Sequence, residues 1–406
     1  MDTESLDTLK KIACDAIDEI AADLHSLSTE IWNHPELGFE EHRAHKVLTD
    51  FLEKNGFLVE RGYTGIETAF RATEGAGEGT HVGVMCEYDA LPEIGHACGH
   101  NLIAEVGAGA GVGIRKAMKA AGKPIGKVTV LGTPNEEEWG GKLELIKNGA
   151  FKDLDIGLMA HPWSVTATGP KGSWLALFTC DVTFKGKASH AAGFPWEGVN
   201  ALDAAVMAYN NVSCLRQQMK PSWRVHGVIR NGGSKPNIIP EETALEYYVR
   251  APTMGEAYKL QEKVENCFKA AATATGCTVD IHWWSNPYEN MITNRQLADL
   301  YERNAQAVGV EFCQDEEKLK SATGSTDMGN VSHVVPSIHP MFYIGGDAAN
   351  HTREFTDIAG ADKAQKYTLD QAKVLAMTAL DVLCKPELLD IIKKQFQEDL
   401  EDDAKT

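Results

Sequence analysis

Histidine, cysteine and carboxylate side chains occur together at four places that lie far apart in this 406-residue chain. Cys98 and His100 stand two positions apart, and Glu136-Glu137-Glu138, His161 and His351 follow. Thiolate and imidazole are ligands for Zn²⁺ and similar ions, and carboxylates also accept harder ions such as Mn²⁺. Each segment alone has an ordinary explanation, because a histidine is more often hydrogen-bonded than metal-bound and a carboxylate run is usually solvated. All four together indicate a metal site.

These four segments follow short apolar stretches that have the character of buried strands. The stretches are His81–Cys86, Lys127–Leu131, Asp155–Ala160 and Pro340–Ile344. Helix-like segments separate them, which predicts βαβ units and a mainly parallel sheet. Ligands bind beyond the carboxyl ends of the strands in such sheets. We therefore expect the donors to meet at one rim. The other long helical patterns are Asp7–Ile31, Glu41–Asn55, Leu102–Ala121, Arg295–Val308 and Asp362–Leu383.

The spacing of the donors favours a site that is assembled by the completed fold. The predicted ligands spread over ~250 residues, and the chain has no second C-x-x-C or H-x-x-x-H half-site. Both observations argue against a zinc finger. A thiolate such as that of Cys98 has enough lone pairs to bridge two cations. Glu136 and Glu137 are neighbours, and side chains of neighbouring residues in an extended segment point in opposite directions. One carboxylate can then bind metal while the other acts as a general base for hydrolysis.

The middle of the chain has a different pattern. Strand-like and helical segments follow in the order β-α-β-β-α-β between about residues 173 and 290, which predicts a ferredoxin-like α+β domain. We expect this domain to interrupt an α/β domain made of residues 1–172 and 291–406.

Several motifs resemble those of peptidase family M20, in its amidohydrolase subfamily. Gly95–Asn101, with the sequence GHACGHN, resembles the H-A-C-G-H-D/N motif, and Gly132–Glu137 is similar to G-T-P-A-E-E. Further matches follow in the family's order: His161-Pro162, Gly186–Ala192, Pro236–Pro240, Ser325–Asp327 and His351-Thr352. The resemblance covers nearly the whole chain. It is strongest for the branch that contains M20 domain-containing dipeptidases and the B subunit of p-aminobenzoyl-glutamate hydrolase.

The resemblance implies a zinc-peptidase-like catalytic domain with two divalent ions, Zn²⁺ or Mn²⁺, with Co²⁺ as a further possibility. Cys98 would bridge the ions, and Glu136 would be the general base beside a metal-activated water. The remaining ligands would be His100, Glu137, His161 and His351. The substrate would be a small dipeptide or an N-acyl amino acid with a free carboxylate.

The inserted domain would act as a lid and form a homodimer. His190 would reach the partner subunit's active site and stabilise the oxyanion. Asn237 and Arg250 would hold the substrate's carboxylate or backbone.

Three details leave alternatives open. Asp89 either orients a ligand histidine or caps the turn at Leu91-Pro92, and the sequence does not favour one over the other. Glu138 and Trp139 replace the small residues that are common in the family, and Trp139 would narrow the pocket. The glycine-rich segment Gly107–Gly113 lies within a helical pattern and lacks the G-x-G-x-x-G spacing, so close helix packing is favoured over nucleotide binding.

Composition excludes several classes of protein. Asp and Glu outnumber Lys and Arg by 58 to 39, giving a net charge of −19, so nucleic acid is not an expected partner. No run approaches the ~18 apolar residues that a membrane span needs. The N-terminus lacks secretory character and the nine cysteines are scattered, which favours free thiols and a cytoplasmic location.

Two alternatives to the hydrolase remain. One is a catalytically silent relative that binds a ligand or a partner. The other treats Cys98 as a redox thiol, which would react with alkylating agents whether or not metal is present.

Overall fold

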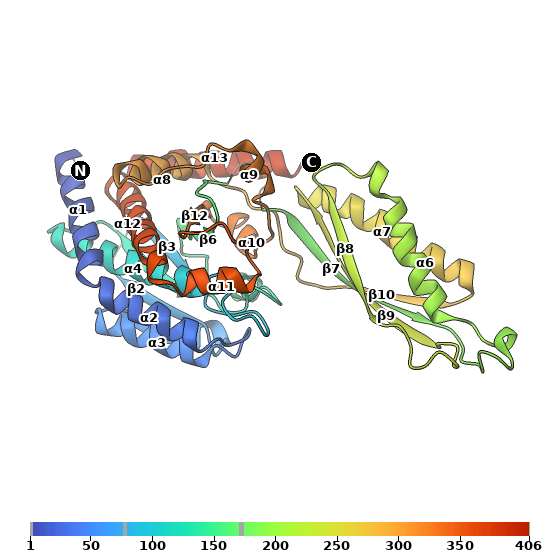
Figure 1. Ribbon diagram of the computed structural model, residues 1–406. Helices are drawn as coiled ribbons and strands as arrows, with labels where there is room; N and C mark the ends of the chain where they lie inside the picture. Colours follow the sequence, from blue (N-terminus) through green and yellow to red (C-terminus); the bar gives the residue numbers. More distant parts are fainter. Residues whose placement is uncertain (1–2, 76–78, 170–173, 406) are drawn as a thin grey trace. The chain divides into compact units, whose positions relative to one another are not determined.

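In a computed structural model of the chain, residues 3–75, 79–169 and 174–405 are described. The chain divides into two units, and Figure 1 labels most of their helices and strands. The larger unit comprises Met1–Ser173 and Met291–Asp402, and the inserted unit comprises Trp174–Asn290 with Asp403–Thr406. The boundary that we expect between residues 172 and 173 lies outside the described residues.

A six-stranded sheet forms the centre of the larger unit, in the order β1-β2-β4-β3-β5-β11. Its strands are β1 (Leu58–Arg61), β2 (Phe70–Glu74), β3 (His81–Cys86), β4 (Lys127–Gly132), β5 (Ile156–Leu158) and β11 (Ser337–Ile338). β4, β3, β5 and β11 pair in parallel, whereas β1 and β2 form an antiparallel edge. The expected α/β fold with a mainly parallel sheet is confirmed.

A second, two-stranded sheet pairs β6 (His161–Trp163) with β12 (Met341–Tyr343) in parallel. The apolar stretch Pro340–Ile344 corresponds to β12. We expected this stretch to be a strand of the main sheet, but it pairs with β6 in the second sheet instead. β5 and β11 are only three and two residues long. The chain leaves the main sheet after both strands and pairs again in β6 and β12, so His161 opens a new strand.

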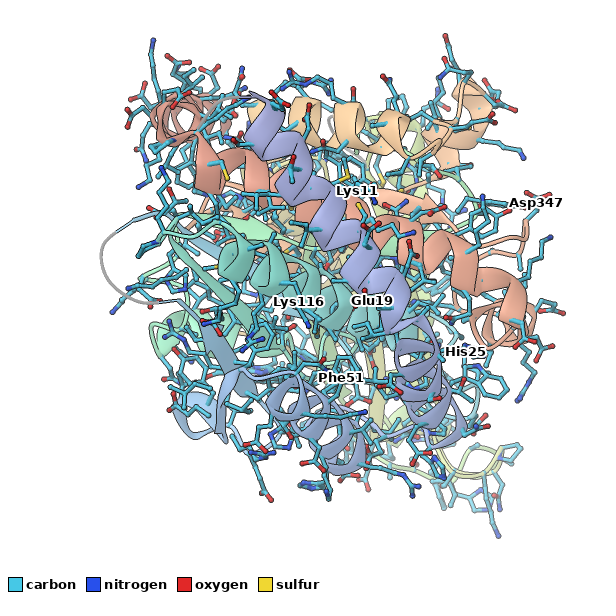
Figure 2. The ribbon with its side chains drawn as sticks, turned by 90° about the vertical axis from the view of Figure 1, so that its left-hand side faces the viewer. Lys11, Glu19, His25, Phe51, Lys116 and Asp347 are labelled. Atoms are coloured by element: carbon cyan, nitrogen blue, oxygen red, sulfur yellow. The ribbon has the colours of Figure 1, made fainter. Side chains whose placement is uncertain are left out.

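Eleven α-helices pack around these sheets in the described part of the larger unit. They are α1 (Thr3–Glu19), α2 (Ala21–Asn33), α3 (His42–Lys54), α4 (His100–Ala120), α5 (Gly141–Lys147), α8 (Arg295–Ala307), α9 (Glu316–Ser321), α10 (Met328–Ser332), α11 (Arg353–Ala359), α12 (Asp362–Cys384) and α13 (Pro386–Asp403). The prediction of one continuous helix over Asp7–Ile31 is wrong, because the chain turns at Ile20. α1 packs against α4 and α12, whereas α2 contacts α3 and α4, so a single straight helix would not serve both sets of neighbours. Figure 2 shows α1, with Lys11 and Glu19 labelled, lying across α4.

Two apolar clusters cover the two faces of the main sheet. Val82 and Val84 of β3 belong to the cluster beneath α1, α4 and α12, whereas Met85 belongs to the cluster shared with α5 and α10. α4 lies very close to the sheet, since a Cβ on Gly107 would come within 2.7 Å of the carbonyl oxygen of Met85. The glycine-rich stretch therefore serves helix packing, as the sequence favours.

The inserted unit is a four-stranded antiparallel sheet in the order β10-β7-β9-β8, with two helices. Its elements are β7 (Ala176–Lys185), α6 (Ala201–Cys214), β8 (Arg224–Asn231), β9 (Glu242–Ala251), α7 (Met254–Thr275) and β10 (Thr278–Trp283). Alternate residues of β7 and β9 form one core with α6 and α7. This arrangement is the expected ferredoxin-like fold. Among the described helices of the whole chain, none is both long and apolar enough to cross a membrane.

Candidate metal centre

Cys98 lies at the centre of the predicted ligands. It stands in the loop after β3, and Gly99, whose φ is 78°, turns the chain into α4 at His100. The Sγ atom of Cys98 is 3.4 Å from Nε2 of His161, which opens β6. Cys98 belongs to two groups in which each residue offers one donor atom within 4.8 Å of the others. The groups are Cys98 with His100 and His161, and Cys98 with Glu137 and His351. The structure therefore brings all five predicted ligands together.

His351 reaches the centre from the loop after β12. Its backbone N–H donates to the carbonyl oxygen of Ala97 at 2.8 Å, which fixes this loop beside Cys98. Its Nε2 is 3.6 Å from Oε2 of Glu137, and its side chain is 55% exposed. Asn350, which sequence reasoning missed, donates from Nδ2 to Sγ of Cys98 at 3.9 Å. This loop forms the solvent-facing side of the centre.

Asp89 connects two of the predicted ligands. Its Oδ1 is 3.0 Å from Nδ1 of His100, and its Oδ2 accepts a hydrogen bond from the backbone N–H of Glu137 at 2.9 Å. Asp89 is fully buried, so these contacts are not shared with bulk solvent. A carboxylate behind a ligand histidine fixes which ring nitrogen faces the metal. The geometry thus favours orientation of His100 over a cap on the turn at Leu91-Pro92.

Glu136 and Glu137 do not lie in an extended segment, contrary to the basis on which we expected their side chains to diverge. Residues 136–139 form a turn, and Asn135 before them has a φ of 57°. Both carboxylates offer an oxygen within 4.8 Å of a ring nitrogen of His100. Their surroundings still differ, because Glu137 also lies near Cys98 and His351, whereas Glu136 lies near Glu87 and Asp327.

The donors fit divalent ions. Burial and the neighbouring Glu137 raise the pKa of the Cys98 thiol, so a thiolate here needs a cation beside it. Burial lowers the pKa of His161 to about 3, which leaves its imidazole neutral, as a metal ligand must be. Nε2 of His100 and Oε1 of Glu137 are buried and make no hydrogen bond within the described part of the chain. Sulfur, nitrogen and oxygen donors in this combination suit Zn²⁺, Co²⁺ and Mn²⁺.

Sequence reasoning missed a buried charged cluster next to this centre. It consists of Glu87, Lys142 and Asp327. Glu87 directly follows β3 and Asp327 ends one of the family motifs, but no pattern around Lys142 indicates burial.

The inserted unit holds the predicted substrate residues in two places. His190 is exposed, and its Nδ1 accepts hydrogen bonds from the N–H groups of Ala192 and Gly193. Asn237 lies beside it, because its carbonyl oxygen accepts the N–H of Ala191 at 3.0 Å. Arg250 does not join them. The end of β7 that leads to His190 pairs with Glu242, whereas Arg250 lies at the other end of β9, roughly 26 Å away at ~3.3 Å per residue.

The model of Peptidase family M20/M25/M40 matches residues 83–372 of the chain. The chain belongs to this family. It is 53% identical to the Xaa-Arg dipeptidase of Mus musculus, over 97% of this chain and 93% of that protein. Identity to the Xaa-Arg dipeptidase of Homo sapiens is 51%, over 98% and 94%. Identity to the B subunit of the Escherichia coli p-aminobenzoyl-glutamate hydrolase is 30%, over 75% of this chain and 66% of that protein.

Solved structures of the family share the fold at low sequence identity. A putative aminohydrolase from methicillin-resistant Staphylococcus aureus has a TM-score of 0.75 at 18% identity, covering 92% of this chain and all of that one. A Bacillus subtilis protein described as a dinuclear metal binding peptidase of family M20 has a TM-score of 0.67 at 17% identity, covering 90% and 99%. Membership of the family and the converging donors make this chain a metal-dependent hydrolase of peptide or amide bonds, and a catalytically silent relative is not favoured.

Proposed function

We propose that this chain is a dipeptidase that hydrolyses small dipeptides, foremost those with a C-terminal arginine. The observation that carries the proposal is the gathering of Cys98, its four neighbouring donors and Glu136 at one centre. Two relatives that are 53% and 51% identical over nearly the whole chain are Xaa-Arg dipeptidases. The net charge of −19 also favours the approach of a cationic substrate.

Two Zn²⁺ or Mn²⁺ ions, or Co²⁺ in their place, would share Cys98. His100 and His161 would hold one ion, and Glu137 and His351 the other, following the two donor groups. Bound ions of this kind polarise a carbonyl and lower the pKa of water.

Glu136 is the proposed general base. Its carboxylate takes a proton from the attacking water and returns it to the leaving amine nitrogen as the C–N bond breaks. Burial, together with Glu87 and Glu137, raises the pKa of Glu136 in the protein without cations, so this carboxyl group has a strong tendency to hold a proton.

The inserted unit would complete the site in a homodimer. His190 of the partner subunit would donate a hydrogen bond to the oxyanion, and Asn237 beside it would bind the substrate's carboxylate. Arg250, at the far end of the sheet, would contribute from a separate position. Exposed apolar side chains support dimerisation through this unit. They are Val228 and Ile229 on the edge strand β8, and Val206, Met207 and Tyr209 on α6.

A cytoplasmic location fits the cysteines. All nine lie in the described residues and none forms a disulfide, as is usual in a reducing compartment.

Hydrolysis assays on metal-reconstituted protein test the function. The panel contains Ala-Arg, Ala-Lys, Ala-Leu, Ala-Glu, N-acetyl-Arg and p-aminobenzoyl-glutamate, each with Zn²⁺, Mn²⁺ or Co²⁺. We expect kcat/KM for Ala-Arg to exceed that for Ala-Leu by roughly tenfold or more, since a polar recognition site discriminates strongly against an apolar analogue. Equal rates would overturn the preference for arginine. Cleavage of the N-acyl compounds alone would favour the second candidate, an N-acyl amino acid hydrolase, and cleavage that survives a chelator would overturn the metal-dependent mechanism.

A further inference from the structure

A lysine ammonium is buried between two carboxylates next to the metal centre. Lys142, in the first turn of α5, has no exposed surface. Its Nζ donates to Oδ1 of Asp327 at 2.6 Å and also to Oε1 of Glu87. Its backbone N–H donates to Oδ2 of Asp327 at 2.9 Å. One residue therefore holds both oxygens of Asp327.

The carboxylates around Lys142 have the arrangement of an oxygen-only cation site. Glu87, Glu136 and Asp327 are all buried, and each offers an oxygen within 4.8 Å of the others. Three carboxylate oxygens are the donors that Mn²⁺ and Mg²⁺ prefer. We call these three residues the carboxylate cage. The cage adjoins the Cys98 centre, since Oε2 of Glu87 is 3.5 Å from Nε2 of His100.

Three buried carboxylates so close together cannot all be ionised without a positive charge between them. Removing a carboxylate from water costs several kcal/mol unless an opposite charge and hydrogen bonds compensate. Burial favours the neutral amine of Lys142, but Asp327, Glu87 and Glu136 together hold its pKa above the ordinary value. The residue that faces the cage therefore carries a fixed positive charge.

We propose that Lys142 is a built-in cation that occupies the carboxylate cage, keeps a divalent ion out of it and thereby leaves Glu136 as a base instead of a metal ligand. An ammonium ion and a divalent ion cannot occupy the same cage. Without Lys142, Glu87, Glu136 and Asp327 would ligate a third ion, and that ion would hold the carboxylate of Glu136 in place as a ligand. Lys142 is a positioning residue, because it acts on the reaction through Glu136. The inference rests on the proposed role of Glu136.

Metal stoichiometry tests this proposal directly. Lys142→Met removes the charge at nearly constant volume. Lys147→Met is the matched control, because Lys147 lies in the same helix but is exposed and pairs only with Glu144 at 3.0 Å among the described residues. Each protein is loaded with Mn²⁺, freed of excess ion and analysed for metal per chain. We expect Lys142→Met to hold about one ion more than the roughly two of the wild type and of Lys147→Met.

Kinetics give a second readout. If Glu136 becomes a ligand, kcat for Lys142→Met should fall on the order of 10²-fold or more while KM changes little. Adding Glu87→Gln removes one carboxylate together with the ammonium, so the double variant should lose most of the third ion and regain part of kcat. A purely structural Lys142 would change stability and leave the number of bound ions unaltered.

The outcomes separate this inference from the proposed function. Wild-type protein that holds two ions and hydrolyses dipeptides, with a Lys142→Met variant that also holds two, overturns the inference alone. Wild-type protein that binds no metal and cleaves nothing in the panel overturns the proposed function. If Lys142→Met does not fold, Lys142→Gln, which keeps a hydrogen bond donor, takes its place. Failure of both to fold with Mn²⁺ supplied throughout shows that a divalent ion cannot replace the ammonium, and overturns the inference.

Discussion

Glu136 and Glu137 are adjacent, but the structure gives their carboxylates different neighbours. Glu137 lies 3.8 Å from His100 and 3.6 Å from His351, and Asp89 holds its backbone N–H. We expect Glu136→Gln to keep its metal and lose on the order of 10²-fold or more in kcat, since only the proton acceptor is gone. Glu137→Gln should lose metal. Metal analysis and steady-state kinetics of both variants decide the matter, and the reverse pattern would exchange the two roles.

Asp89 touches neither substrate nor metal in this scheme, yet its loss should weaken metal binding. Asp89→Asn keeps the volume but removes one of the two acceptors that hold Nδ1 of His100 and the N–H of Glu137. We expect metal affinity to fall by about 10–100-fold, as is usual when the carboxylate behind a ligand histidine is changed. Competition with a chelating dye measures the affinity. Asp347→Asn is the control, because Asp347 is 78% exposed and lies in the loop that leads to His351 (Figure 2). Equal affinities in the two variants would contradict a role for Asp89 in orienting ligands.

Most of the predicted ligands could be proposed from the sequence because cysteine and histidine are infrequent and follow recognisable apolar strands. The buried position of Lys142 could not be predicted in this way. Lysine is almost never fully buried unless it is paired, so its default interpretation is a solvated side chain. Its partners Glu87 and Asp327 lie 55 and 185 positions away, and only the completed fold brings them together.

At the scale of elements, the turn that carries Glu136 and Glu137 depends on a residue from α3's N-terminus. Glu41 is buried, and its Oε1 accepts the backbone N–H of Asn135 at 2.8 Å. Asn135 has a φ of 57°, a conformation that asparagine adopts more readily than most residues. Its carbonyl oxygen accepts the N–H groups of Gly140 and Gly141, which closes the loop.

Glu41→Ala should loosen this loop. It leaves the N–H of Asn135 buried without its acceptor, which costs about 1–3 kcal/mol, and it should lower kcat because Glu136 is no longer held in place. Glu41→Gln keeps a carbonyl oxygen in reach of that N–H and should stay much closer to the wild type. Thermal unfolding and kcat are measured for both. Equal losses in the two variants would show that the carboxylate charge, and not the hydrogen bond, is what the loop needs.

The contact between α4 and α12 contains a buried acid away from the metal centre. Burial raises the pKa of Glu105 to about 7 from the ordinary 4.5, against the effect of a 3.1 Å hydrogen bond from Gln365. As pH rises from 4.5 to 7, the unfolded chain has released this proton while the native chain still holds it. Ionisation therefore favours the unfolded state, and native stability falls over this window.

Glu105→Gln should remove this dependence. Its unfolding free energy relative to the wild type should rise by up to about 3 kcal/mol between pH 4.5 and 7 and then level off. Thermal unfolding of both proteins at matched metal concentration from pH 5 to 8 measures the difference. Parallel curves would mean that Glu105 is already ionised in the native protein at pH 5.

Elements with strong periodicity were predictable, and short elements were not. β3, α4, α12 and the whole inserted unit lie close to their expected positions, because each buries a regular apolar pattern. β11 has two residues and α10 five, which is too short for a periodic signal. The break between α1 and α2 falls at Ile20, and no proline or glycine lies near it. It follows from the positions of the neighbouring helices, which the local sequence does not contain.

At the scale of the whole molecule, the question is whether one chain forms a complete site. The predicted metal donors and Glu136 all lie in the larger unit, whereas His190 and Asn237 lie in the inserted unit. His190 is exposed, and its Nδ1 accepts hydrogen bonds from the backbone N–H groups of Ala192 and Gly193. A residue that reaches into another subunit's site would be placed in this way. A symmetric dimer would give each site Glu136 from one chain and His190 from the other.

Mixed dimers test this arrangement. Glu136→Gln and His190→Ala should each be nearly inactive alone, because each lacks one essential group at both sites of its homodimer. When the two variants are unfolded and refolded together in equal amounts, about half of the dimers should be mixed, since equivalent subunits pair statistically. In a mixed dimer one site lacks both groups, and the other has Glu136 from one chain and His190 from its partner. Activity should therefore return to roughly a quarter of the wild-type value. No return of activity, with mixed dimers demonstrated by a mass tag on one variant, would place His190 in its own chain's site or outside catalysis.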